Sequence, residues 1–238
     1  LHVRSRRQRQ MCIRDRPTYL QMVHELTPTE AGLMMLPMVL GMLGTGMAVG
    51  FIIARTGRYK IYPLAGMAVT TLGLYLFSQL TPQASLTRLG VYMFVFGFGL
   101  GLVMQVLVLI VQNSFPLRMV GTATSTNNFF RQIGSAIGAS LAGSLFIHGM
   151  RDHLETRLPE ALAQLGPEGA QWAEKFQNGA NSLTPHLVAQ LPGPLREVVL
   201  SSYNDGLTPV FMLMVPLTIV ALILLFPVKE EPLKEDLS

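Results

Sequence analysis

The sequence carries no acidic residue where it is most apolar. Its 14 Asp and Glu residues all lie outside five apolar stretches, which cover residues 31–54, 61–80, 89–112, 124–148 and 208–226. A stretch of about 20 residues forms a helix that can cross a hydrocarbon layer of about 30 Å. The stretches lack the polar alternation of barrel strands, and in lipid each segment must satisfy its own backbone hydrogen bonds. We therefore expect an all-α membrane protein with five spans.

Cysteine is almost absent. The single cysteine, Cys12, precedes the first apolar stretch, so the chain can form no internal disulfide and no thiolate metal site within its spans. His148, Asp152 and His153 are close in sequence, but the two histidines are five residues apart and do not share a helical face. We expect neither a metal nor another cofactor.

Basic charge is concentrated in one short segment. Residues 1–16 hold six arginines and one acid, whereas residues 17–238 hold 12 basic and 13 acidic side chains. Outside the tail there is no basic stripe that could neutralise the phosphates of a nucleic acid. The sequence also lacks a glycine-rich phosphate loop of the Walker type and a specific set of nucleophile, base and orienting residue. These absences disfavour a nucleic-acid-binding protein, an ATP-driven pump and an enzyme.

Lysine and arginine in the short loops predict the orientation. Loop 55–60 carries Arg55, Arg58 and Lys60, and loop 113–123 carries Arg118. Because short cytoplasmic loops are enriched in Lys and Arg, both loops are predicted to be cytoplasmic. Alternation then places residues 18–30, 81–88 and the long loop 149–207 outside, and the C-terminal segment inside. The prediction is a multi-pass protein of the plasma (inner) membrane.

Four segments carry a resemblance to a known family. They are PTYLQMVHELTPTEAGLMMLP at 17–37, GFIIARTGRYK at 50–60, GLGLVMQVLVLIVQNSFPLRMVGTATS at 99–125 and FFRQIGSAIG at 129–138. Together they resemble the C-terminal part of fourteen-span drug:proton antiporters, the EmrB/QacA-like branch of the major facilitator superfamily.

The resemblance implies a fold, a function and partners. The fold would be the C-terminal helical bundle of such a transporter, incomplete, over residues 17–238. The function would be secondary active efflux of small amphipathic or cationic molecules in exchange for protons, and the partners would be the lipid bilayer, such a substrate and protons. The proton-carrying carboxylates of the family lie in its N-terminal half, which this sequence lacks. The alternative is a non-transporting membrane module, such as a sensor or assembly partner, that has kept a transporter-like fold.

Residues 1–16 do not fit the resemblance. Tyr19 to Val23 would be the extracytoplasmic end of a preceding span, yet the residues before them are arginine-rich rather than apolar. A transit peptide is one interpretation, although the segment is poor in serine and has no clear apolar face. We favour a foreign or artefactual tail joined to a genuine fragment.

The loop after the first span resembles motif A of the superfamily, Gly-x-x-x-Asp-Arg-x-Gly-Arg-Lys. The matching residues are Gly50, Arg55, Gly57, Arg58 and Lys60. Gly57 permits a tight turn with positive φ, and the guanidinium groups can hold carboxylates or helix C-termini in one state of a transport cycle. Ala54 stands where the family has Asp, so half of the charge relay is absent. Either the loop is a conformational latch or its charges only set the topology.

Polar side chains within the spans are the other site candidates. Gln105 and Gln112 are seven residues apart and share a helical face. Asn127 and Arg131 share a face of the fourth span, and Gln132 follows them in the FFRQIG segment. A charged residue at the bilayer centre costs about 2.5 to 3.5 kcal/mol, so we expect these faces to point inward. For Arg131 the alternatives are a cavity or gate and simple anchoring; for Gln105 they are a cavity and an interhelical hydrogen bond.

Two further patterns bear on packing. Small residues recur at four-residue spacing in the pairs Gly46 and Gly50, Gly97 and Gly101, and Gly134 and Gly138, and they predict close helix contacts. Residues 151–165 and 168–178 have helical spacing with polar faces, so we expect short amphipathic helices within the proline-broken outer loop.

Overall fold

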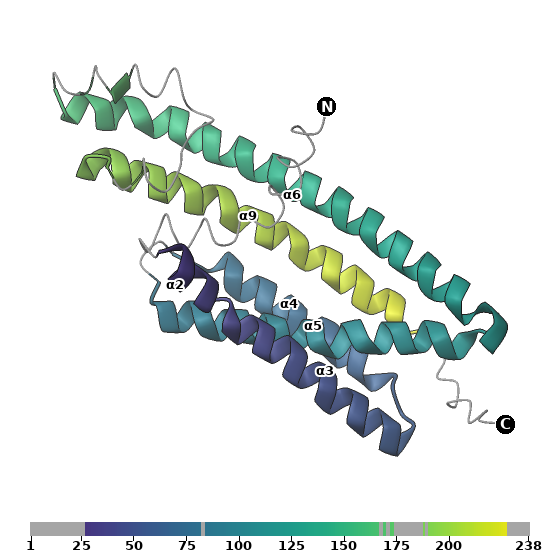
Figure 1. Ribbon diagram of the computed structural model, residues 1–238. Coiled ribbons are helices and arrows are strands. Elements are labelled where there is room, and N and C mark those ends of the chain that lie inside the picture. The colour runs from purple at the N-terminus through teal and green to yellow at the C-terminus, as the bar shows by residue number, and fades with distance from the viewer. Residues whose placement is uncertain are drawn as a thin grey trace, which may run out of the picture. The chain divides into compact units, whose positions relative to one another are not determined.

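The computed structural model describes residues 27–81, 84–166, 169, 172–173, 188 and 190–227. The arginine-rich tail, Tyr19 to Val23, most of residues 168–178 and the C-terminal segment after Pro227 lie outside these residues. The described parts fold into helices, with no strand among them (Figure 1). The elements are α2 (Pro28–Leu33), α3 (Leu36–Thr56), α4 (Ile61–Ser78), α5 (Leu86–Ser114), the 3₁₀ helix η1 (Leu117–Met119), α6 (Val120–Gln164) and α9 (Gly193–Leu225).

Five of the described helical segments are long and apolar enough to cross a membrane, and each overlaps one predicted span. This confirms the all-α class and the five spans. The expected bounds of the first three spans differ from those of α3, α4 and α5 by at most a few residues. The first span is preceded by α2, which begins at a capping box: Glu30 donates its backbone N–H to Thr27 Oγ1 over 3.3 Å, and Glu30 Oε2 accepts from Thr27 N over 2.8 Å.

Helical structure extends into both ends of the segment 149–207, which the sequence analysis treated as an outer loop. Helix α6 continues without interruption to Gln164, and α9 begins at Gly193, well before the apolar stretch that starts at 208. The helical periodicity of residues 151–165 was correctly interpreted, but these residues extend a span instead of forming a separate helix. Hydropathy marks where a helix is apolar and does not mark where the helix ends.

Pro159, one of the prolines of the segment 149–207, does not break α6. It lies inside the helix, where it removes one i to i−4 hydrogen bond. Leu154 and Ala161, seven residues apart on one face around it, are both buried. The helix runs through the proline with this face buried.

The chain divides into two compact units. The spanning unit comprises residues 35–79, 84–141 and 211–238, and the extension unit comprises residues 1–34, 80–83 and 142–210. Helices α6 and α9 each contribute one part to each unit.

In the spanning unit, α5 packs against both α3 and α4 (Figure 1). Glycines make these contacts close: a Cβ placed at Gly41 of α3 would lie 2.8 Å from the carbonyl oxygen of Phe94, and one placed at Gly66 of α4 would lie 2.6 Å from Leu102 Cβ. Within lipid, helix association depends on such close backbone approach because no hydrophobic force drives it. Gly97 and Gly101 lie against the backbone of α3, as their spacing predicted, whereas nothing lies within 4 Å of a Cβ at Gly134 or Gly138.

The C-terminal half of α9 joins the same unit through α4. The rings of Phe77 and Phe211 stack with centroids 5.3 Å apart, and Thr71 Oγ1 donates to Thr218 Oγ1 over 2.9 Å. Both contacts bring segments together that are far apart in sequence. They are polar and aromatic contacts of the kind that hold spans together in lipid.

The extension unit joins α6 to α9 beyond the apolar stretches. Arg157 forms an ion pair with Asp205, with Nη1 2.7 Å from Oδ2, and Asn204 Nδ2 donates to the carbonyl oxygen of Leu80 over 3.1 Å. The backbones approach closely at Gly206, where a Cβ would lie 2.7 Å from the backbone nitrogen of Met150. These residues form a specifically paired structure in a region where the sequence predicted mainly loop.

Candidate functional site

The loop that resembles motif A is a tight turn held at both ends. Helix α3 ends at Gly57, which has φ 70° and donates its N–H to the carbonyl oxygen of Ile53 over 2.8 Å. This left-handed backbone favours glycine, because a side chain there would be strained. The prediction of a positive φ at Gly57 is confirmed.

Tyr59 anchors this loop, and the sequence analysis did not single it out. Its side chain is only 2% exposed and packs in a core cluster with Val49, Ile53, Leu102 and Val106. An aromatic residue flanked by two cations in a short loop was the available signal, since a loop facing only water has no need of one. The tyrosine fixes the charged residues on either side of it relative to α3 and α5.

The three cations of the loop have different surroundings. Arg55 lies over the ring of Phe51, 4.3 Å from its centroid, and Lys60 Nζ lies 6.0 Å from the ring of Phe226. Arg58 is exposed and forms no ion pair within the described residues. Its role as a latch therefore stays a prediction.

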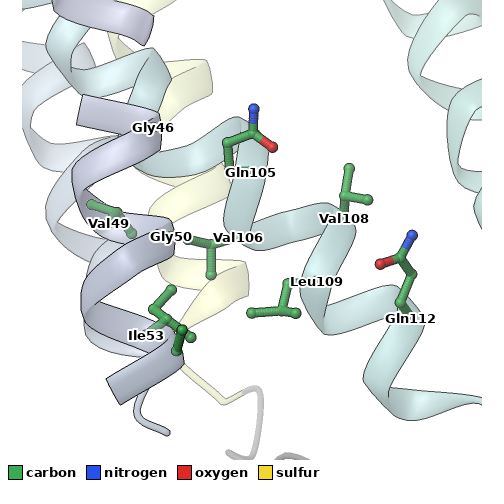
Figure 2. Close-up of a pocket in the computed structure, with 10 residues that line it drawn as sticks. Gly46, Val49, Gly50, Ile53, Gln105, Val106, Val108, Leu109 and Gln112 are labelled. Carbon is green, nitrogen blue, oxygen red and sulfur yellow. The ribbon is translucent and has the colours of Figure 1, made fainter. Parts of the chain in front are cut away.

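A cavity of about 440 Å³ lies between α3 and α5, next to this loop (Figure 2). It is lined by small and apolar residues together with two amides: Gly46, Val49, Gly50, Ile53, Ala54, Gln105, Val106, Val108, Leu109 and Gln112. Its size falls within the range of about 300 to 1,000 Å³ that is usual for small-molecule pockets. The structure thus brings Gly50 and Ala54 of the motif A segment to the same cavity as the two glutamines.

The two glutamines occupy the same side of α5. Figure 2 shows their amides on one side of the helix with Val108 between them, whereas Leu109 points toward Ile53 of α3. Gln105 also packs on α3, because a Cβ at Gly46 would lie 3.2 Å from Gln105 Cγ. Each amide offers two donors and one acceptor oxygen. The arrangement can hydrogen-bond a ligand that is otherwise held by apolar contacts.

The polar residues of α6 are more open than the sequence predicted. Asn127 is half-buried, and Arg131 and Gln132 are exposed. Arg131 reaches α5, with Nη1 3.8 Å from Met104 Sδ, so its guanidinium lies beside the residue that precedes Gln105. Asn127 and Gln132 do not line the cavity. Of the α6 candidates, Arg131 contacts α5, at Met104, and does not line the cavity either.

The histidines of α6, His148 and His153, belong to no cluster of metal-binding side chains among the described residues. His148 Nδ1 lies 2.9 Å from the carbonyl oxygen of Ser144, one turn earlier in its own helix. Within the described ranges, no three His, Cys, Asp or Glu side chains lie together as metal ligands would.

More than half of the chain matches a known protein family. A family profile described as Major Facilitator Superfamily matches residues 16–139, just over half of the chain. The chain belongs to the Major Facilitator Superfamily. With five apolar helices in the part of the chain that the structure describes, it is a multi-pass membrane protein.

Relatives of this superfamily chain carry transporter names. An uncharacterized MFS-type transporter of Mycobacterium tuberculosis is 37% identical over 219 residues, which are 92% of this chain and 30% of that protein. Multidrug resistance protein 3 of Bacillus subtilis is 27% identical over 215 residues, 88% of this chain and 40% of that protein. An efflux pump of Gibberella fujikuroi is 26% identical over 222 residues, 93% of this chain and 39% of that protein. The chain thus spans between 30% and 40% of the length of these curated relatives.

Proposed function

We propose that this chain forms part of a secondary active exporter of small amphipathic molecules, of the fourteen-span EmrB/QacA-like kind, in the plasma (inner) membrane. The cavity between α3 and α5 carries the proposal, because it combines apolar walls with the amides of Gln105 and Gln112. Pockets of this composition suit varied apolar ligands that need a few hydrogen bonds. Relatives named as efflux pumps and multidrug resistance proteins support the same function.

The loop at 55–60 is the proposed conformational element. Tyr59 packs it onto α3 and α5, the two helices that enclose the cavity, so a change in the loop is transmitted to the cavity walls. Arg58 is available for a carboxylate or a helix C-terminus that is present in only one state of the cycle. This would bias the balance between inward-open and outward-open states.

Protons are proposed to enter through groups outside the described spans. The apolar stretches contain no Asp or Glu, and their one histidine, His148, lies at the edge of the fourth. A membrane proton carrier needs a side chain that titrates near the working pH and faces a wet cavity. The superfamily assignment argues for transport rather than for enzymatic activity.

A non-transporting membrane module is the second candidate. It is favoured by Ala54, because the family pattern has an Asp at this position of the loop. A chain without that carboxylate could keep the fold and lose the switching that transport requires.

Efflux measurements separate the two. In the complete protein that carries this chain, Gln105→Leu and Gln112→Leu should each reduce energy-dependent export of fluorescent amphiphiles by roughly two- to tenfold, the effect of one lost hydrogen bond. Gln79→Leu is the matched control, since Gln79 is exposed at the end of α4 and away from the cavity. Absence of any energy-dependent export from the parent protein would favour the non-transporting module.

A further inference from the structure

No described residue that lines the cavity between α3 and α5 carries a charge. Apart from Gln105 and Gln112, whose side chains are neutral amides, the lining consists of glycine, alanine, valine, leucine and isoleucine. Resting on the proposed exporter function, we propose that this cavity binds uncharged, elongated amphiphiles that carry a hydrogen-bonding group at each end.

A charged ligand finds no opposite charge in this lining. The neighbouring cations have other positions: Arg55 lies over the ring of Phe51, and Arg131 contacts Met104, which does not line the cavity. An ion that enters a mainly apolar cavity gives up much of its hydration, and a neutral amide replaces only part of it. Carboxylate and ammonium groups are therefore both disfavoured relative to a neutral group of the same size.

The two amides determine the length of the ligand. Gln105 and Gln112 are seven residues apart, so about 10 Å of helix axis separates them, and Figure 2 shows Val108 between them. Among the residues that the structure describes, neither amide has a hydrogen-bond partner. Each amide offers both donors and an acceptor. A ligand whose polar groups are about 10 Å apart can therefore bond both amides while its apolar middle lies on Val108.

Small residues of α3 leave room for the apolar part of the ligand. A Cβ at Gly46 would point at Gln105 and lie 3.2 Å from its Cγ. Gly50 is one turn further along α3, so a Cβ there points to the same side of the helix, yet nothing lies within 4 Å of it. A larger side chain at residue 50 would therefore enter the cavity without striking the protein.

The competing explanation is that a lipid acyl chain fills this cavity. An acyl chain has no polar group in its hydrocarbon part, so it would make no use of the two amides. This explanation predicts that binding follows the hydrophobicity of a ligand alone. Ligands with one apolar body and different end groups distinguish the two explanations.

Gly50→Leu identifies the binding that belongs to the cavity. In the complete protein that carries this chain, the leucine should remove that binding and leave the size-exclusion profile unchanged. Gly44→Leu is the matched control, because Gly44 is also an exposed glycine of α3 with nothing within 4 Å of a Cβ, but it does not line the cavity. Ala54→Leu, at another lining position, decides the question if Gly50→Leu does not elute as the parent does. Unchanged ligand binding in a variant that elutes normally would overturn the proposal.

Dansyl sulfonamides with a straight alkyl tether form the ligand set. A tether of seven methylene groups, which matches the spacing of about 10 Å, ends in a carboxamide, a carboxylate, an ammonium group or a methyl group. Binding in neutral-lipid proteoliposomes is followed by dansyl fluorescence and corrected for partition into protein-free liposomes. In the component that Gly50→Leu removes, the carboxamide should bind at least about tenfold more tightly than either charged compound. Equal or tighter binding of a charged compound, or of the methyl compound, would overturn the proposal.

Tether length tests the contact with both amides. With seven methylene groups, Gln105→Leu and Gln112→Leu should each weaken binding of the carboxamide by roughly five- to tenfold, the effect of one lost hydrogen bond. With two methylene groups the ligand reaches one amide at a time, so either variant leaves the other amide available and should change binding by only about twofold. Equal sensitivity of the short and long ligands would contradict the two-point contact.

The efflux assay keeps the two proposals distinct. Energy-dependent export that favours charged amphiphiles and persists in Gly50→Leu would refute the ligand class and leave the exporter function intact. Binding of the neutral ligand that Gly50→Leu removes, in a protein without energy-dependent export, would refute the exporter function and leave the ligand class intact.

Discussion

Gly97 of α5 lies against the main-chain carbonyl of Met38 on α3, at a position where any Cβ would overlap the carbonyl oxygen. Because the obstacle is backbone, it cannot be relieved by turning a side chain. Because Gly97 has a hydrogen atom where any other residue has a Cβ, α3 and α5, which enclose the cavity, can approach to this distance.

Replacement of this glycine should separate α3 from α5. Gly97→Val is expected to destabilise the purified protein by more than the roughly 1 to 3 kcal/mol of ordinary overpacking, because the clash is with backbone. Thermal aggregation in detergent, followed by size-exclusion chromatography, measures the effect. Gly44→Val is the matched control in a span, since nothing lies within 4 Å of a Cβ there. Similar loss of stability in both variants would show that helix propensity, and not the contact, is responsible.

Arg58→Ala tests the conformational role of the loop. We expect efflux by the complete protein to fall several-fold while membrane abundance and substrate binding stay near the parent values, because the residue would act on the balance of states. Arg88→Ala is the control for loss of an exposed cation, since Arg88 lies in the first turn of α5. If efflux is unchanged in Arg58→Ala, the charges of the loop serve only topology.

The predicted orientation can be tested with single cysteines in a Cys12→Ser background. A cysteine that replaces Thr56 at the end of α3 should resist impermeant maleimide in intact cells and react after permeabilisation. A cysteine that replaces Gln164 at the end of α6 should react in intact cells. Both positions are exposed, so access to the reagent depends on the side of the membrane. The reverse labelling pattern would mean that the orientation is inverted.

Two neighbouring residues of α9 should differ in their contribution to stability. Asn204 is buried and donates to the Leu80 carbonyl, so Asn204→Ala should cost about 1 to 3 kcal/mol through an unpaired buried carbonyl. Asp205 pairs with Arg157, but the two side chains are 36% and 41% exposed, so Asp205→Asn should cost only about 0.2 to 1 kcal/mol. Thermal unfolding in detergent measures both. A larger loss in Asp205→Asn would mean that the ion pair, and not the buried amide, holds the extension unit together.

The chain by itself should not couple transport to protons. Reconstituted in vesicles with a pH-sensitive dye inside, residues 18–238 are expected to show no substrate-dependent proton flux, because the spans contain no carboxylate and no central histidine. The complete transporter serves as the positive control. Proton exchange by the chain alone would overturn the assignment of coupling to groups outside it.

The five spans could be predicted because burial in lipid acts on each segment separately. A helix in hydrocarbon satisfies its own backbone, so an acid-free apolar run is sufficient evidence for it. The turn at Gly57 was predictable for a similar reason, since φ there depends on a single residue. The ends of α6 and α9 could not be predicted in this way. Polar residues occupy 149–164, where Pro159 also lies, and 193–207, and they are held in helices by burial and by pairs such as Arg157 with Asp205.

The shared face of Gln105 and Gln112 follows from their spacing alone, as does the close packing at Gly97 and Gly101. Three other features depend on how α3, α5 and α6 pack together. The glutamines open onto a cavity shared with Ala54, Tyr59 fixes the loop, and Arg131 reaches Met104. Periodicity in the sequence assigns a side chain to one face of its own helix. It gives no information on the distance from that side chain to another helix. Those distances are set where glycine permits two backbones to meet, and only the tertiary structure decides them.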